Sequence, residues 1–279
     1  MDLKQQIQLA QSQLAGFEVP PLPAELLKLQ AIFQTTEFPE LSEVAEIIGQ
    51  NTVLTGELIK VANQSQFLRK GSDSVQTIKG AIDSLGMTKL KNLVFGLGFK
   101  AQIPELAFTE LMEHTLDVAN VAAALSHWVE GIQADEAYLA GVFHNAGAII
   151  MEMKFGEYRS TFFNTLTNCY SGLSKEIEKY QVSHGVYGLL VAKKWRLDSR
   201  YAQVMLMHHQ RNLAVIKDDH VRALVAIIQL ANVLVSEVSF DSYIGQEVRE
   251  MSATTREELL IDGDVIDEIR TALLSNSLV

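Results

Sequence analysis

Proline is confined to the beginning of this 279-residue chain. All five prolines, Pro20, Pro21, Pro23, Pro39 and Pro104, fall in the first 104 residues. Beyond them only glycine interrupts helix formation, and apolar residues recur at three- and four-residue steps, as in Leu116, Ala119 and Ala123. Runs of alternating polar and apolar residues between turn dipeptides, which are typical of strands, are essentially missing. The sequence therefore predicts an all-α protein.

The helical pattern predicts three regions. Short amphipathic segments fill residues 1–104, where we expect an N-terminal helical subdomain. The composition shifts around Ile103–Pro104, and residues 105–240 then predict a helical core. Residues 241–279 are acidic and amphipathic, and predict a C-terminal helical tail that packs on the body of the protein.

Composition excludes several classes of protein. The 23 basic and 34 acidic residues give a net charge of −11, which repels nucleic acid and anionic membranes. The most apolar run, LVAIIQLANVLV from Leu224, is shorter than the roughly 18 residues of a membrane span and contains Gln229 and Asn232. No signal peptide is recognisable at the N-terminus, and the single Cys169 rules out an internal disulfide framework. We expect a cytoplasmic protein.

Five of the seven histidines lie in segments that predict helices of the C-terminal part. They are His114, His144, His184 and the pair His208–His209. Imidazole is the commonest protein ligand of transition metals, and several helices can direct ligands to one point in a bundle. The alternative is that each is a hydrogen-bonded core residue. His127 and His220 fall outside this pattern and are predicted to be surface residues.

The order of these residues resembles the HD superfamily of metal-dependent phosphohydrolases. That superfamily carries a histidine, a His-Asp pair and a distant aspartate around one or two metals. The N-terminal part resembles a branch of it, the HDOD domain (HD-related output domain) of bacterial signal-transduction proteins. The resemblance rests on VPPLPAELLKLQ from Val19, on Leu-Ile-Lys-Val-Ala-Asn at residues 58–63 and on TIKGAIDSLGMTKL. It implies an HD-like helical bundle with an N-terminal helical subdomain.

The chain departs from the metal-binding pattern at three positions. Asn145 stands where the resemblance places the aspartate of the His-Asp pair, Asn232 stands at the final aspartate, and Gln210 follows the two histidines in place of glutamate. Each change keeps the shape and removes an anion. A pair of unit charges about 4 Å apart contributes roughly 4 kcal/mol at an effective dielectric constant of ~20, so metal affinity should fall by orders of magnitude.

The resemblance therefore implies a relic of a metal site with no catalytic residues. We expect these residues to share one pocket: His114, His144, Asn145, His184, His208, His209 and Asn232. No cofactor is expected. If a divalent transition metal (Mn, Fe, Ni or Zn) does bind, its ligands are expected among the five histidines, because clustered imidazoles bind late transition metals without carboxylates.

Three functions follow as hypotheses. The first is a non-catalytic signal-transduction output or scaffold module of HDOD type, whose partners are other signalling proteins or a small-molecule or nucleotide ligand. The second is a metal-dependent phosphohydrolase, specifically a phosphodiesterase. The third is a DNA-binding regulator, suggested by the helix-turn-helix spacing of Ala45, Gly49 and Leu58, although no arginine lies there to contact phosphate.

A basic run between His184 and the histidine pair is a candidate anion-binding segment. Lys193, Lys194 and Arg196 would be its cations, with Arg200 close by in the sequence. Cations at the end of a helix are also favoured by the helix dipole alone, so a solvated surface remains the alternative.

Overall fold

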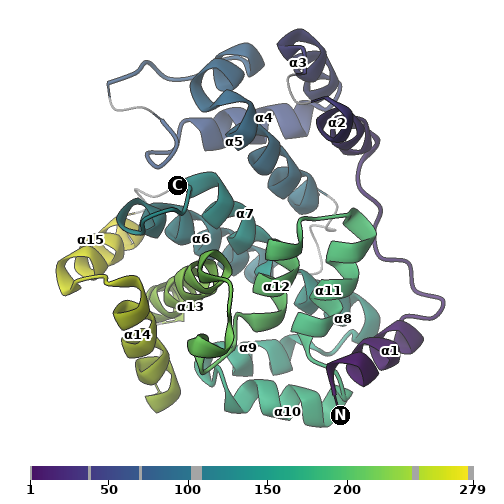
Figure 1. Cartoon of the computed structure of the whole chain (residues 1–279), viewed down its shortest axis with the longest axis vertical. Helices are drawn as coiled ribbons and strands as arrows, with labels where there is room; N and C mark the ends of the chain where they lie inside the picture. The colour runs from purple at the N-terminus through teal and green to yellow at the C-terminus, as the bar shows by residue number, and fades with distance from the viewer. Residues whose placement is uncertain (1, 37–38, 69–70, 102–108, 241–244, 276–279) are drawn as a thin grey trace.

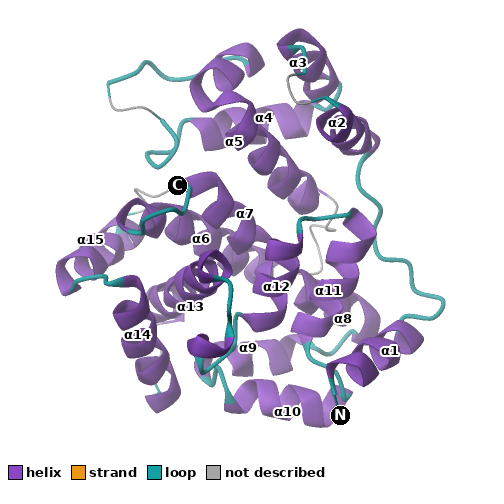
Figure 2. Ribbon diagram, viewed as in Figure 1, coloured by secondary structure: helices purple, strands orange, loops and turns teal. Residues whose placement is uncertain are grey.

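The computed structural model contains only helices and the loops that connect them in the part of the chain that it describes, residues 2–36, 39–68, 71–101, 109–240 and 245–275. It is 76% helical, and no strand occurs among these residues (Figure 2), which confirms the all-α prediction. The α-helices are α1 Leu3–Gln13, α2 Ala24–Thr35, α3 Leu41–Gly49, α4 Thr52–Ala62, α5 Ile78–Ala101, α6 Thr109–Leu125, α7 Ala134–His144, α8 Ala146–Phe155, α9 Arg159–Thr167, α10 Ser171–Tyr180, α11 His184–Trp195, α12 Ser199–Met207, α13 Asp219–Phe240, α14 Gln246–Leu259 and α15 Gly263–Leu274.

The helices form two lobes, which lie one above the other in Figure 1. The N-terminal lobe consists of α2–α5, and the C-terminal lobe contains α6–α13 with α14 and α15 on one side. Helix α1 belongs spatially to the C-terminal lobe, because it packs against α11. There Gln13 Nε2 donates a hydrogen bond to the Tyr180 carbonyl at 3.0 Å.

Helix α5 joins the two lobes. Gly86 interrupts it with a φ of +76°, a conformation that favours glycine and divides α5 into two helical stretches. The second stretch packs against α7 of the C-terminal lobe, and Asn92 Nδ2 there donates to Asp135 Oδ2 at 2.7 Å. This partly buried contact fixes the N-terminal lobe to the helix that ends at His144.

Helix α13 is the centre of the C-terminal lobe. It packs against α6, α7, α9, α12, α14 and α15. Its length and composition alone would allow it to cross a membrane, but 72% of its apolar window is buried inside the protein. Packing on several sides accounts for its apolar sequence, as expected of a core helix.

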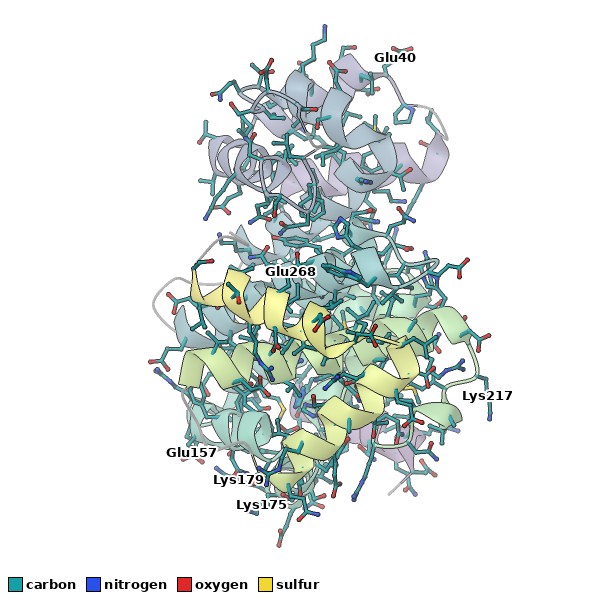
Figure 3. All side chains as sticks on the ribbon, turned by 90° about the vertical axis from the view of Figure 1, so that its left-hand side faces the viewer. Glu40, Glu157, Lys175, Lys179, Lys217 and Glu268 are labelled. Atoms are coloured by element: carbon teal, nitrogen blue, oxygen red, sulfur yellow. The ribbon has the colours of Figure 1, made fainter. Side chains whose placement is uncertain are left out.

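The two expected region boundaries, at 104/105 and at 240/241, touch segments outside the described residues. Beyond the second boundary, α14 and α15 both pack on α13. Charged side chains lie at the surface of both lobes (Figure 3), for example Glu40 on the N-terminal lobe and Lys175 and Lys179 at the far end of the C-terminal lobe.

Candidate functional site

Five helices bring the predicted histidines together in the C-terminal lobe. His114 lies within α6, His144 ends α7, His184 begins α11, His208 caps α12, and Asn232 lies on α13. The ring centroids form a continuous chain of contacts, with separations of 6.5 Å for His114–His144, 5.2 Å for His144–His208, 5.0 Å for His184–His208 and 4.3 Å for His208–His209. We call these five histidines with Asn232 the histidine cluster.

Two glycines allow the helices to approach closely enough for these contacts. A Cβ on Gly141 would lie 2.4 Å from the Ala119 Cα, so α6 and α7 touch backbone to backbone. A Cβ on Gly147 would lie 1.8 Å from the His184 carbonyl oxygen, where α8 meets α11. The close approach at Gly141 positions His114 and His144, and the one at Gly147 positions His184. Neither position can hold a side chain without separating the helices.

At one end of the cluster, His114 and Asn232 bind each other. Asn232 Nδ2 donates to the Ile228 carbonyl at 3.0 Å, which identifies Oδ1 as the acceptor on its other side. His114 Nε2, 2.9 Å from that Oδ1, therefore carries the proton and donates it. A protonated ring nitrogen has no lone pair to offer a metal ion.

His144 and Asn145 are buried side by side at the junction of α7 and α8. His144 Nδ1 lies 2.6 Å from the Gly141 carbonyl and donates to it, which leaves Nε2 as an acceptor. Within the described part of the chain, Asn145 Nδ2 has no hydrogen-bond partner, and His144 Nε2 has none of ordinary geometry, although the Asn232 side chain lies near enough to oppose the lowering of the His144 pKa. Asn145 is thus buried next to the cluster, but the structure gives it no hydrogen bond to another cluster residue.

At the other end, His184 and His208 face each other through their Nε2 atoms at 3.0 Å. His208 Nδ1 donates to the Met205 carbonyl at 2.8 Å, so the Nε2 of a neutral His208 carries a lone pair. Two lone pairs repel at this distance, so the pair must share either a proton or a cation. Tetrahedral Zn–N bonds of about 2.0–2.1 Å place nitrogens roughly 3.3–3.4 Å apart, and the shorter 3.0 Å separation suits a shared proton better.

A buried glutamate, Glu176 of α10, orients His184. Its carboxylate lies 2.9 and 3.0 Å from His184 Nδ1, accepts the His184 backbone N–H at 2.5 Å and accepts the Tyr158 hydroxyl at 2.5 Å. Both Glu176 and Tyr158 are completely buried. A carboxylate behind a histidine fixes its ring orientation and tautomer, as it does behind histidines that bind metals.

The sequence did not identify Glu176 or Tyr158. In SGLSKEIEKY an inner face chosen by hydrophobicity alone would consist of Leu173, Ile177 and Tyr180, and would leave Glu176 outside it. The structure instead buries the stripe Gly172, Glu176 and Tyr180. One signal in the sequence could have found Glu176. Gly172 and Tyr180 lie four residues to either side of it, so all three share one face of the helix.

Burial disfavours the protonated form of His114, His144, His208 and His209. It lowers the pKa of His114 to about 4 and that of His144 to about 3. The pKa values of His208 and His209 are also held well below the ordinary range, first by burial and then by neighbouring histidines. Burial raises the pKa of Asp117 near His114, and Glu113 is exposed, so neither supplies a buried anion of the kind the resemblance requires.

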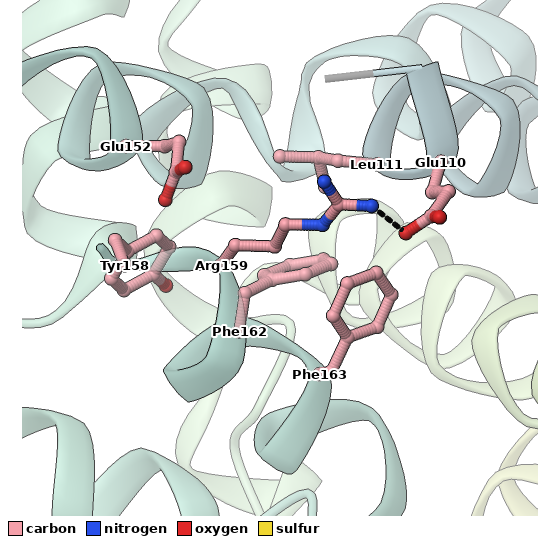
Figure 4. Close-up of a pocket in the computed structure, with 7 residues that line it drawn as sticks. All are labelled: Glu110, Leu111, Glu152, Tyr158, Arg159, Phe162 and Phe163. Carbon is pink, nitrogen blue, oxygen red and sulfur yellow. Dashed lines mark hydrogen bonds and ion pairs between the residues drawn. The ribbon is translucent and has the colours of Figure 1, made fainter. Parts of the chain in front are cut away.

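Two small cavities adjoin the cluster. The first, about 20 Å³, is lined by His208, His209 and Asn232 and is covered by Val248 and Met251 of α14. The second, about 10 Å³, lies between α6, α8 and α9 (Figure 4). There Arg159 forms an ion pair with Glu110 on one side of the opening, and Tyr158, which reaches Glu176, lies on the other. Each has space for about one water molecule.

The predicted anion-binding residues separate in the structure. Lys193 and Lys194 are exposed in the last turn of α11. Arg196, just beyond that helix, lines a different and larger cavity between the two lobes, together with Arg200. None of the three is part of the histidine cluster.

Comparison with known proteins identifies relatives of this chain. A model of the HDOD domain family matches residues 19–211. An uncharacterised protein of Treponema pallidum (strain Nichols) is 23% identical over 224 residues, which are 78% of this chain and 42% of that protein. The chain thus spans less than half the length of this relative.

Solved structures show the same fold at low identity. An HDOD domain protein of unknown function from Geobacter sulfurreducens has a TM-score of 0.68 at 20% identity, covering 98% of both chains. A proposed phosphohydrolase from Shewanella amazonensis SB2B has a TM-score of 0.70 at 18% identity, covering 99% of this chain and 96% of the other. A proposed signal transduction protein from Marinobacter aquaeolei VT8 has a TM-score of 0.68 at 15% identity, covering 99% of this chain and 64% of the other.

Proposed function

This chain belongs to the HDOD domain family, and we propose that it is a non-catalytic module of signal transduction whose histidine cluster is the relic of a metal site. The observation that carries the proposal is the hydrogen bond from His114 Nε2 to Asn232 Oδ1. These two residues stand where the HD pattern places a histidine and an aspartate as metal ligands. Here each satisfies the other, and the pair needs no ion.

The space around the cluster also supports a non-catalytic role. A phosphodiester has to reach the ions that activate its attacking water and stabilise the developing charge. The cavity beside His208, His209 and Asn232 measures about 20 Å³ and is lined in part by apolar side chains of α14. Binding pockets for small molecules have volumes of roughly 300–1,000 Å³, so this cavity accommodates no substrate.

The donor set at the His114 end does not suit the metal site of an HD phosphohydrolase. His114 Nε2 is protonated and Asn232 Oδ1 already accepts its hydrogen bond. The remaining atom near them that could ligate a metal is the neutral His144 Nε2. A dication there would face neutral groups in a buried site, where desolvating an ion has a large energetic cost. We therefore derive no hydrolytic step from this end of the cluster.

One observation favours the second candidate, a metal-dependent phosphohydrolase. His184, His208 and His209 each offer a ring nitrogen, and these atoms lie within 4.8 Å of one another. Glu176 orients His184 as a carboxylate orients a metal-ligating histidine. Three imidazoles are a sufficient protein ligand set for a late transition metal, which would supply a bound hydroxide.

Metal analysis combined with a hydrolysis assay distinguishes the two candidates. Protein purified without chelator is analysed for bound Mn, Fe, Ni and Zn, and assayed on bis(p-nitrophenyl) phosphate and cyclic dinucleotides with added Mn²⁺ or Ni²⁺. We expect substoichiometric metal and no turnover above that of the His184→Gln variant. Stoichiometric metal together with hydrolysis that His184→Gln abolishes would contradict the proposed module and establish the phosphohydrolase.

A further inference from the structure

A cleft between the two lobes is a feature that the histidine cluster leaves unexplained. Its cavity is about 150 Å³ and is lined from both sides. Phe33 on α2 and Lys91 on α5 come from the N-terminal lobe, while Arg196 and Tyr201, on either side of the α11–α12 connection, come from the C-terminal lobe. We call this cavity the inter-lobe cleft.

The inter-lobe cleft concentrates positive charge on a protein whose net charge is −11. Three cations line it, Lys91, Arg196 and Arg200, against the single carboxylate of Asp198. Arg200 is already neutralised, because it pairs with Glu136 at 2.9 Å and with Asp198 at 3.2 Å. Among the described residues neither Lys91 nor Arg196 forms an ion pair, so two cations remain available to an anion.

Aromatic side chains line the same cavity. Phe33 is partly buried, and Lys91 Nζ lies 5.8 Å from the centroid of its ring. Phe95 and Tyr201 are buried against the cavity, and Tyr201 forms no hydrogen bond with any described residue, which leaves its hydroxyl available to a ligand. Cations beside aromatic rings fit a ligand that is both anionic and flat, because a ring stacks on Phe while its anionic group pairs with Lys and Arg.

We propose that the inter-lobe cleft binds a phosphate monoester that carries one aromatic ring, with the chemistry and size of a mononucleotide. Lys91 and Arg196 bind the phosphate, and Phe33 stacks on the ring. The volume of about 150 Å³ lies below the roughly 300–1,000 Å³ of sites that enclose drug-sized molecules, so the cleft holds the phosphate and the ring and leaves the rest of the ligand in solvent.

The position of the cleft gives such a ligand a structural effect. Polar contacts near the cleft include Gln30 Nε2 of α2 to the Trp195 carbonyl at 2.9 Å. Trp195 Nε1 also donates to the Pro20 carbonyl, in the segment that leads into α2, at 2.8 Å. A ligand held by Lys91 from one lobe and Arg196 from the other adds a contact across this boundary. The ligand therefore favours the arrangement of the lobes that it binds, by as much as it binds that arrangement more tightly than any other.

The proposal is independent of the non-catalytic role, since it involves neither a metal ion nor hydrolysis. It is tested by calorimetric titration of the full chain with 5′-AMP and 5′-GMP, with adenosine and inorganic phosphate as separate probes. We expect at least one nucleotide to bind at least ten times more tightly than either adenosine or phosphate. Equal affinity for inorganic phosphate, or no binding of either nucleotide at millimolar concentration, overturns the proposal.

The chain offers a matched set of variants. Arg196→Gln and Lys91→Gln each remove a cation from the cleft, and each should weaken nucleotide binding about tenfold or more, as expected for a charged hydrogen bond. Lys193→Gln and Lys194→Gln remove the same charge from exposed positions outside the cleft and should leave affinity unchanged. Phe33→Leu should weaken binding of nucleotide but not of phosphate. If the Lys193 and Lys194 variants weaken binding as much as the cleft variants, the nucleotide is attracted by surface charge in general and not bound in the cleft, and the proposal fails.

Discussion

His114 Nε2 and Asn232 Oδ1 lie 2.9 Å apart, and the Asn232 amide bonds the Ile228 carbonyl with its other end. An aspartate at position 232 could not make both contacts, because a carboxylate donates nothing to the Ile228 carbonyl. The amide is therefore the side chain that suits a site without metal. This relationship leads to the first prediction.

The double substitution Asn145→Asp with Asn232→Asp should convert the cluster into a metal-dependent one. Without metal we expect a loss of about 2–4 kcal/mol in the free energy of unfolding, because two carboxylates are placed among buried neutral groups and the bond to Ile228 is lost. With Mn²⁺ or Ni²⁺ added, the melting temperature should rise with metal concentration. The control is Asn145→Ala with Asn232→Ala, which should be destabilised without any rescue by metal. Equal rescue of both variants by metal would contradict the interpretation of positions 145 and 232 as former metal-ligand positions.

The second prediction concerns pH. The pKa values of His114 and His144 are lowered to about 4 and about 3 from an ordinary value of 6.5. Above pH 6.5 these histidines are neutral in both folded and unfolded chains. As the pH falls below 6.5, the unfolded chain binds protons that the folded chain excludes, so the free energy of unfolding falls by about 1.4 kcal/mol per pH unit for each histidine.

This loss should continue until the folded protein itself protonates near pH 4, and His208 and His209 act in the same direction. Urea unfolding at several pH values between 7.5 and 4.5 measures how steeply the free energy of unfolding falls with pH. His144→Gln should make the slope shallower, whereas His127→Gln, at an exposed position, should not change it. A free energy of unfolding that stays constant over this range in the wild-type protein would contradict the lowered pKa values of His114, His144, His208 and His209.

The fold was predictable because its signal is spread over many residues. The absence of proline after Pro104 and the three-to-four spacing of apolar residues both indicate helix, and a helical protein is what the structure shows. The histidines could also be singled out, since polar residues in apolar helical runs are costly unless they serve a purpose. The contacts among them required the structure, because they depend on close helix approaches such as that at Gly147.

Other parts of the two sites were not predictable from local patterns. Glu176 is buried because three donors from Tyr158 and His184 converge on it, and these partners are 8 and 18 residues away in sequence. In the basic run, Arg196 reaches the inter-lobe cleft while Lys193 and Lys194 do not. Arg196 lies just beyond the end of α11 with a φ of +51°, so its side chain no longer follows the helix surface that carries Lys193 and Lys194. Lys91, the second available cation, lies 105 positions before Arg196 in the sequence.

The third prediction concerns the buried carboxylate. Glu176→Ala leaves the Tyr158 hydroxyl and the His184 backbone N–H without their acceptor, and should lower the free energy of unfolding by about 3 kcal/mol or more. Glu176→Gln keeps the shape and one acceptor oxygen, so a smaller loss is expected. Glu178→Ala, at an exposed position of the same helix, should change stability by about 0.5 kcal/mol or less. Chemical denaturation of the three variants gives the comparison, and equal effects of Glu176→Ala and Glu178→Ala would contradict the role assigned to Glu176.

The last prediction tests the helix packing that builds the histidine cluster. Gly147→Ala would place a methyl group 1.8 Å from the His184 carbonyl oxygen and 2.5 Å from the Gly188 nitrogen. Both contacts are with backbone, so α8 and α11 must separate, and a loss of about 3 kcal/mol or more is expected.

Gly56→Ala provides the matched control, since Gly56 lies within α4 and a Cβ there meets nothing within 4 Å. Alanine is the better helix former, so this variant should gain about 1 kcal/mol. The two substitutions are chemically identical and should move the midpoint of urea unfolding in opposite directions. Separation of α8 from α11 also moves His184, so the His144 and His208 side-chain resonances should shift in Gly147→Ala and stay in place in Gly56→Ala. If Gly147→Ala were as stable as the wild type with unshifted histidine resonances, α8 and α11 would not be in backbone contact. The 3.0 Å pairing of His184 with His208 would then lose its structural basis.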